Sequence, residues 1–133
     1  MKKFNTVMLV DDNDTDNYIS QRIMEISGFS DNILTNNNGK AALEYLEQHQ
    51  NDVTKLPDII FLDISMPIVD GYVFLYEFER YSQTVKDKCK VAILTSSDNK
   101  QDIDRMSGNE FVFKYVIKPI TEDVLNEIKA ELI

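Results

Sequence analysis

The sequence predicts an α/β fold in which helices cover both faces of a five-stranded parallel sheet. Short apolar runs alternate five times along the chain with longer segments whose apolar residues have helical spacing. Strands that alternate with helices are parallel, because each crossover passes over the sheet and buries one of its faces. VMLV, IIFL and VAIL are unbroken apolar runs that suit central strands, whereas NILT is short and FVFKYVI contains Lys114 and Tyr115. Placing these last two at the edges predicts the doubly wound strand order 2-1-3-4-5.

The elements follow from the same periodicity, in chain order. The strands are expected at residues 6–10, 32–35, 58–62, 91–94 and 111–117. The helices are expected around residues 19–26, from near 39 to 46, over 70–81, more weakly over 100–106, and from 121 to 132. The spacing of Ile19, Ile23 and Ile26 predicts the first helix, and Gly28 is expected to end it. Thr121 is a suitable N-cap for the last helix.

Composition narrows the range of functions. The chain has 133 residues, 43% of them hydrophobic, which predicts one domain. Its net charge is −9 and no block of basic residues is present, so we expect no binding to nucleic acid. No apolar run approaches the roughly 18 residues of a membrane span. The single cysteine, Cys89, suits a reducing cytoplasm and is interpreted as structural.

Polar residues stand at the carboxyl ends of four of the predicted strands. The first strand ends in Asp11 and Asp12, the third in Asp63, the fourth in Thr95, and the fifth in Lys118. In an open parallel sheet these ends lie along one edge, and ligands bind where the winding direction reverses. Neighbouring strands are roughly 4.8 Å apart, so Asp12 and Asp63 can share one cation. The sequence therefore predicts a site that these five residues form together.

Carboxylate oxygens without clustered histidine or cysteine favour magnesium, manganese or calcium over zinc. The run DNDTD resembles the start of an EF-hand calcium loop, but Asn17 stands where that loop needs glycine and Ile23 where it needs glutamate. Asp14 and Asp16 are interpreted as acidic residues of a first helical turn, which the helix dipole favours, and not as metal ligands.

Four segments in register, VDD, FLDISMPIVDG, ILTSS and VIKP, resemble the receiver domain of two-component response regulators over essentially the whole chain. The resemblance implies a flavodoxin-like (βα)5 fold of the stand-alone, chemotaxis-regulator-like type. It makes Asp63 the phosphate acceptor. It also implies that Asp12, with Asp11 partly through water, Asp63 and the backbone carbonyl of Ser65 hold Mg²⁺, with Mn²⁺ as a possible substitute.

The resemblance also assigns the remaining residues of the site. Thr95 would hydrogen-bond the new phosphoryl group, Lys118 would pair with its charge, and Tyr115 would be the aromatic residue that changes rotamer. A cis peptide bond is implied before Pro119. The donor would be a phosphohistidine on a histidine kinase or a histidine phosphotransfer protein, because no phosphate-binding glycine loop is present for a nucleotide.

We therefore expect a single cytoplasmic receiver domain, residues 1–133, that signals to a downstream protein target. No output domain is expected, because the residues after Lys118 suffice only for the last helix. The protein would be no enzyme beyond catalysing its own phosphorylation and dephosphorylation. One alternative is a magnesium-dependent phosphohydrolase with an aspartyl-phosphate intermediate, although the expected second aspartate is missing at Ser65. Another is a receiver-like interaction module that is never phosphorylated.

Three segments depart from the family pattern. RMSGNEFVFKYV lacks the common glycine-alanine pair before the fifth strand, which puts the shape of that region in doubt. The connections EQHQNDVTKLP and YSQTVKDKCK are longer than usual and are interpreted as solvated surface loops, with partner contacts as the alternative.

Overall fold

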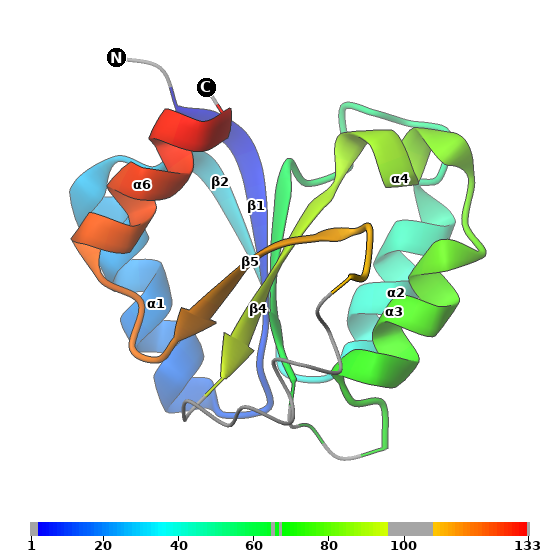
Figure 1. Ribbon diagram of the computed structural model, residues 1–133, viewed down its shortest axis with the longest axis horizontal. Helices are drawn as coiled ribbons and strands as arrows, with labels where there is room; N and C mark the ends of the chain where they lie inside the picture. The colour runs from blue at the N-terminus through cyan, green and yellow to red at the C-terminus, as the bar shows by residue number, and fades with distance from the viewer. Residues whose placement is uncertain (1–2, 65, 67, 96–107, 133) are drawn as a thin grey trace.

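The computed structural model of the protein describes residues 3–64, 66, 68–95 and 108–132 (Figure 1). Five parallel strands form one sheet in the order β2-β1-β3-β4-β5, which confirms the prediction. The strands are β1 (Phe4–Val10), β2 (Ser30–Asn36), β3 (Ile59–Asp63), β4 (Lys90–Thr95) and β5 (Val112–Ile117). The helices are α1 (Asp14–Ser27), α2 (Gly39–Gln48), α3 (Gly71–Glu79), α4 (Gln83–Lys88) and α6 (Glu122–Leu132). The helix expected at 100–106 lies outside the described residues.

The sheet separates two hydrophobic cores. Helices α1 and α6 cover one face, and α2, α3 and α4 cover the other (Figure 1). Side chains alternate along each strand, so Met8 and Val10 of β1 enter the core beneath α2 and α3, while Val7 and Leu9 enter the core beneath α1 and α6. All four are fully buried, as expected for a central strand covered on both faces.

Helix α1 begins and ends as predicted but buries a partly different face. Gly28 ends it in the left-handed conformation, with φ of 65°. The buried positions are Asn17, Ser20 and Met24, whereas the side chains of Ile19 and Ile26 are exposed. Ile23 packs against the core beneath α1 and α6, so the spacing of the isoleucines predicted the helix correctly but only one of its core-facing positions.

The two long connections are joined by hydrogen bonds; residues 51–55 of the first are exposed, in agreement with a surface loop, whereas the second contains helix α4. The backbone N–H of Ser82 donates to Gln50 Oε1 at 2.9 Å, and the Ser82 hydroxyl donates to the Gln50 carbonyl at 3.1 Å. Ser82 also caps helix α4, which the sequence did not predict. The helix buries Val85, and Cys89 at its end is buried as well.

Strand β5 contains a bulge in the segment whose shape was in doubt. Val91 pairs with Val112, but the next residue, Ala92, pairs with Lys114. The extra residue reverses the alternation of side chains, so Lys114 lies on the α6 side and forms ion pairs with Glu131 at 3.1 Å and with Glu127 at 3.4 Å. Tyr115 consequently points to the opposite face of the sheet and packs against the other core.

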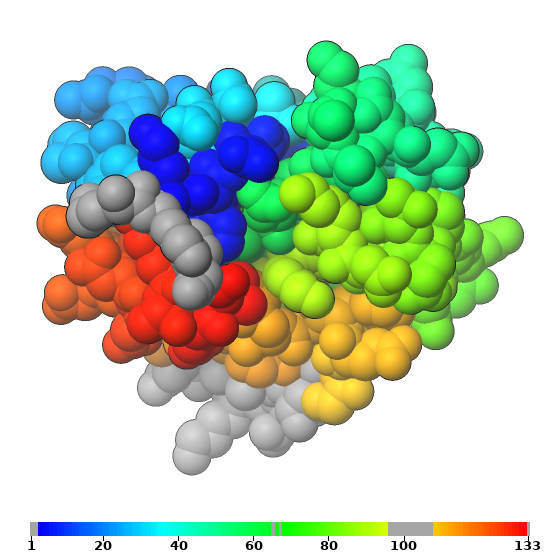
Figure 2. All heavy atoms as spheres, turned by 90° about the horizontal axis from the view of Figure 1, so that it is seen from above, coloured from blue at the N-terminus to red at the C-terminus, as the bar shows by residue number. Residues whose placement is uncertain are grey.

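At the end of the sheet where the strands begin, hydrogen bonds and an ion pair join neighbouring elements. Figure 2 looks onto this end, where the start of β1, the end of α6 and the segment entering β4 surround one hollow. The carboxylate of Asp58 accepts the backbone N–H of Asn5 at 2.9 Å and the ammonium of Lys88 at 2.5 Å. Asp58 therefore ties the start of β3 to β1 and to the end of α4.

Candidate functional site

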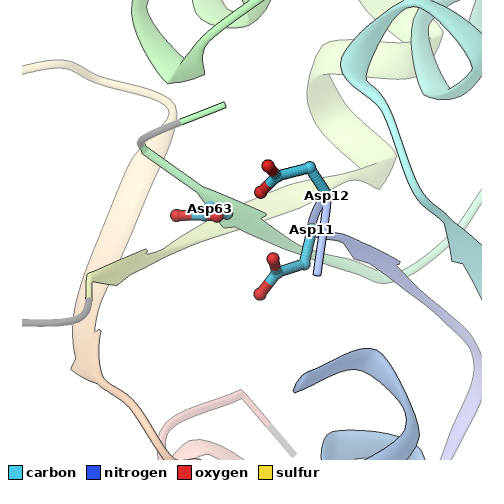
Figure 3. Close-up of side chains that lie close together, drawn as sticks. All are labelled: Asp11, Asp12 and Asp63. Carbon is cyan, nitrogen blue, oxygen red and sulfur yellow. The ribbon is translucent and has the colours of Figure 1, made fainter. Parts of the chain in front are cut away.

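Three carboxylates meet at the opposite edge of the sheet, where the strands end. Asp11 and Asp12 follow β1 and Asp63 ends β3, and each offers an oxygen within 4.8 Å of the others (Figure 3). Asp11 and Asp63 are buried, whereas Asp12 is exposed. The residues at these strand ends are therefore brought together as the doubly wound order predicts.

The turn from β1 into α1 holds Asp11 in place. One carboxylate oxygen of Asp11 accepts the backbone N–H of Asn13 at 2.9 Å, and the Asn13 side chain in turn caps α1 by accepting the N–H of Asp16. The buried Asn17 amide donates to the carbonyl of Asp11 at 2.8 Å and to that of Asn36 at 3.3 Å. A polar residue on the buried face of α1 thus pairs with the carbonyls that end β1 and β2.

Ile64, which follows Asp63, is hydrogen-bonded to β4 and to the start of α3. The N–H of Ile64 donates to the carbonyl of Leu94, and the N–H of Gly71 donates to the carbonyl of Ile64. A Cβ at Gly71 would lie 2.9 Å from the Ile64 Cα, so this close approach requires glycine. Ile68 has φ of 67° and is 98% exposed, a strained backbone for a β-branched residue. Ser65, whose carbonyl was assigned to the metal, lies outside the described residues.

Lys118 extends from the end of β5 into the group of carboxylates. Its ammonium lies 2.7 Å from Asp11 Oδ2, 3.2 Å from Asp16 Oδ2 and 3.4 Å from Asp63 Oδ2. The backbone N–H of Lys118 donates to the carbonyl of Thr95 at 2.8 Å, and the following peptide bond to Pro119 is cis, as the family resemblance implied. The predicted convergence of Lys118 with the aspartates is therefore present.

Two opposing effects act on the pKa of Lys118. Burial disfavours the charged ammonium and by itself would lower the pKa. The hydrogen bond to Asp11, the charges of Asp63 and Asp11, and the hydrogen bond to Asp16 outweigh burial and raise the pKa above its ordinary value. Lys118 is therefore a permanent positive charge in this site at neutral pH.

Thr95 and Tyr115 lie on neighbouring strands at the same end of the sheet. Thr95 ends β4, is buried, and pairs with Ile117 of β5 in the strand register. Tyr115 pairs with Ile93 and is half-buried, and burial raises the pKa of its hydroxyl. Thr95 therefore contacts Lys118 through the backbone, whereas Tyr115 precedes Lys118 by three residues and packs against the core beneath α2 and α3.

Asp16 is the residue that the sequence interpretation missed. It was assigned only to the helix dipole, yet its carboxylate contacts Lys118. In the sheet β5 lies three strands from β1, so the strand order alone does not suggest that Asp16 and Lys118 are in contact. The signal that could have revealed it is the topology, because α1 and α6 cover the same face and bring the first turn of α1 beside the connection from β5 to α6.

A hollow of about 250 Å³ opens beside this contact. Its lining comprises Asp16, Ile19, Ser20, Lys118 and Pro119. The lining thus combines the exposed side chains of Ile19 and Pro119 with the charged groups of Asp16 and Lys118. Lys118 can therefore be reached from the side of α1.

An open parallel sheet that gathers aspartates, a threonine and a lysine at the carboxyl ends of its strands is the arrangement that the resemblance to receiver domains predicts. A family model for the response regulator receiver domain matches residues 7–129. The chain belongs to this family and is a receiver domain of two-component signalling.

Individual relatives agree with the family assignment. The chain is 33% identical over 126 residues to the probable methanogenesis regulatory protein FilR2 of Methanothrix harundinacea, covering 95% of this chain and 79% of that protein. It is similar to the crystal structure of a two-component response regulator from Cytophaga hutchinsonii, with a TM-score of 0.89 and 29% identity over 98% of this chain and 97% of that one. The phosphorylated cyanobacterial phytochrome response regulator RcpA matches with a TM-score of 0.72 and 30% identity, over 93% and 87% of the two chains.

Membership of the family has direct consequences. Receiver domains are signalling proteins rather than classical enzymes, they generally bind Mg²⁺, and they interact with histidine kinases and downstream targets. The alternative of a magnesium-dependent phosphohydrolase finds no support among these relatives. Within the described residues, no helix combines the length and the apolar character needed to span a bilayer.

Proposed function

We propose that this receiver accepts a phosphoryl group from a phosphohistidine on the carboxylate of Asp63 and signals through a changed protein contact. The observation that carries the proposal is the placement of Asp63. Its carboxylate lies within 4.8 Å of oxygens from Asp11 and Asp12 and 3.4 Å from the Lys118 ammonium. The acceptor, a group of oxygen ligands and a cation for the incoming charge are thus within reach of one another.

The chemistry is a direct displacement at phosphorus. A carboxylate oxygen of Asp63 forms a bond to the phosphorus atom while the bond from phosphorus to the imidazole nitrogen breaks, and the electron pair of that bond returns to the imidazole. The product is an aspartyl phosphate, a labile acyl phosphate that suits a reversible signal. Lys118 stabilises negative charge on the transferring oxygens, and Thr95 donates a hydrogen bond to one of them.

The donor set fits a divalent cation. Asp11, Asp12 and Asp63 supply hard carboxylate oxygens, which are the ligands that Mg²⁺ and Mn²⁺ prefer, and the resemblance adds the Ser65 carbonyl. Mg²⁺ bound there would offset the negative charge that a phosphoryl group brings to this edge of the sheet. Asp11 is anchored by Asn13 and Asn17, so this part of the ligand set is held in place by the protein itself.

A protein donor agrees with the approach to the site. The exposed apolar side chains of Ile19 and Pro119 beside Lys118 suit contact with a folded partner. For output, phosphoryl contacts to Thr95 and Lys118 would favour one of two arrangements of the surrounding chain. Tyr115, packed on the face of β5 away from α6, would report that change to a downstream protein.

Intact-mass spectrometry after incubation with acetyl phosphate and Mg²⁺ tests this function. The expected result is one added phosphoryl group in the wild type, and none when EDTA removes the metal. Asp63→Asn is expected to abolish the added mass, whereas Asp14→Asn, which removes an exposed acidic residue of the same charge, is expected to retain it. Modification that persists in Asp63→Asn would reject Asp63 as the acceptor.

A further inference from the structure

We infer that Asp16 is a positioning residue, an anionic partner that holds Lys118 until a phosphoryl group on Asp63 replaces it. The inference rests on the proposed function, because it concerns the partner that Lys118 exchanges on phosphorylation. It assigns a role to a residue at the start of α1 that is neither the acceptor nor one of the proposed metal ligands.

Lys118 has as many carboxylate partners as its ammonium has N–H donors. A lysine ammonium has three N–H donors and no acceptor. In this structure three carboxylates surround it, with hydrogen-bonding distances of 2.7 Å to Asp11 and 3.2 Å to Asp16 and an ion pair of 3.4 Å to Asp63. Phosphoryl oxygens on Asp63 can therefore engage Lys118 fully only if one of its present partners withdraws.

Burial decides which partner withdraws. The side chain of Asp11 is 2% exposed, and releasing it would leave a buried carboxylate without its ammonium, which is costly. The side chain of Asp16 is 38% exposed and borders an open hollow, so water can replace the ammonium at low cost. The geometry thus makes Asp16 the exchangeable partner and Asp11 the permanent one.

Two effects of opposite sign follow from this exchange. Without Asp16, Lys118 is still anchored by Asp11 but no longer shared with a competing anion, so a phosphoryl-like group on Asp63 should bind more tightly. In the absence of that group, the same ammonium should interact more strongly with Asp11 and Asp63. Mg²⁺ must then compete with it for these two carboxylates, so it should bind more weakly. A residue with a merely structural role would not shift the two affinities in opposite directions.

The experiment uses the full chain and beryllofluoride, a tetrahedral anionic mimic of a phosphoryl group that coordinates a carboxylate oxygen. Its affinity is measured at saturating Mg²⁺ by amide NMR titration, and Mg²⁺ affinity is measured separately by calorimetry. Asp16→Asn is expected to bind beryllofluoride about fivefold more tightly and Mg²⁺ more weakly than the wild type, since partly exposed ion pairs change an equilibrium by roughly this amount. Asp16→Glu, which restores the charge, is expected to return both affinities toward the wild type.

Asp14→Asn is the matched control, because it removes the same charge from the same helical turn and Asp14 is exposed. Equal affinities in Asp16→Asn and Asp14→Asn, or weaker beryllofluoride binding in Asp16→Asn alone, would overturn the role of Asp16. Failure of the proposed function gives a different result. In that case the wild type would not bind beryllofluoride, or Asp63→Asn would bind it as well as the wild type, and the inference would fall with it.

Discussion

Asp58 and Asp63 stand at the two ends of the same strand and have opposite surroundings. Asp58, just before β3, accepts a backbone N–H and the ammonium of Lys88. Asp63, the last residue of β3, lies among the carboxylates of Asp11 and Asp12, and Lys118 is shared with two further acidic groups. The aspartate at the amino end joins elements of the fold together, whereas the aspartate at the carboxyl end belongs to a local excess of negative charge.

The difference separates acidic residues that stabilise the fold from acidic residues that serve the function of the domain. A carboxylate with its own counterion is explained by the folded structure alone. Several carboxylates that share one ammonium leave like charges close together, which raises the energy of the folded state and persists only where something else requires it. The same edge also contains Ile68 in a left-handed backbone conformation, another locally unfavourable feature.

At the end of the sheet where the strands begin, the buried thiol of Cys89 should be unreactive. Burial raises the pKa of the Cys89 thiol from 9.0 to about 12, and Lys88 and Lys90 only partly oppose this. At pH 8 the folded protein should react with iodoacetamide at least about a hundredfold more slowly than the urea-unfolded chain, because the thiolate is the nucleophile. The group stabilises the fold fully below the ordinary thiol pKa, and this contribution is lost as pH rises from about 9 toward 12. Rapid alkylation of folded protein, followed by mass spectrometry, would contradict the prediction.

A divalent cation bound at the carboxyl end of β3 should stabilise the folded protein. A ligand that binds only the folded state adds about 2.7 kcal/mol at a concentration of 100 times its Kd. Thermal unfolding followed by circular dichroism should therefore show a Tm that rises with Mg²⁺ and returns to its starting value with EDTA. Asp12→Asn should remove most of this rise, whereas Asp58→Asn should retain it. Equal responses of the two variants would show that the ion binds elsewhere.

Neutralising the two aspartates of β3 should change stability in opposite directions. Without metal, Asp58→Asn is expected to lower the free energy of unfolding by about 2 kcal/mol, because it removes charge-assisted hydrogen bonds. Asp63→Asn is expected to raise it by about 1 kcal/mol, because it relieves repulsion from Asp11 and Asp12 while Lys118 keeps its ion pairs with Asp11 and Asp16. Urea unfolding of both variants provides the comparison, and a loss of stability in both would mean that Asp63 is as well compensated as Asp58.

Relief of the strain at Ile68 should give the smallest effect. Asparagine tolerates the left-handed region better than isoleucine, and the exposed side chain contributes little packing, so Ile68→Asn should add about 1 kcal/mol to the free energy of unfolding. Ile26→Asn is the control, since Ile26 is also exposed but belongs to helix α1. A similar gain in both variants would point to lost surface hydrophobicity rather than strain.

The sequence was sufficient for the parts of the molecule that depend on local pattern. Unbroken apolar runs identified the buried central strands, and the polar residues at their ends identified the site, because strand direction and order place them together. Gly28 and Thr121 marked helix ends through backbone chemistry that acts within a few residues, and the structure agrees at both positions.

Features that depend on contacts between distant segments were not predictable in this way. Helix α4 is too short for a periodic signal and is held by Gln50 from another connection. The bulge in β5 is visible only in the pairing with β4. The contact between Asp16 and Lys118 joins two elements that are distant along the chain and come together only because α1 and α6 share one face of the sheet.

The central claim is that the carboxylate of Asp63, among its acidic neighbours, is the group that receives phosphorus. The most direct test is chemical localisation of the modified residue. After reaction with acetyl phosphate and Mg²⁺, borohydride reduces an aspartyl phosphate to homoserine, which peptide mass spectrometry can assign to one position. We expect homoserine at position 63 and unmodified Asp11 and Asp12. Homoserine at position 11 or 12, with Asp63 unchanged, would contradict the claim that Asp63 is the acceptor.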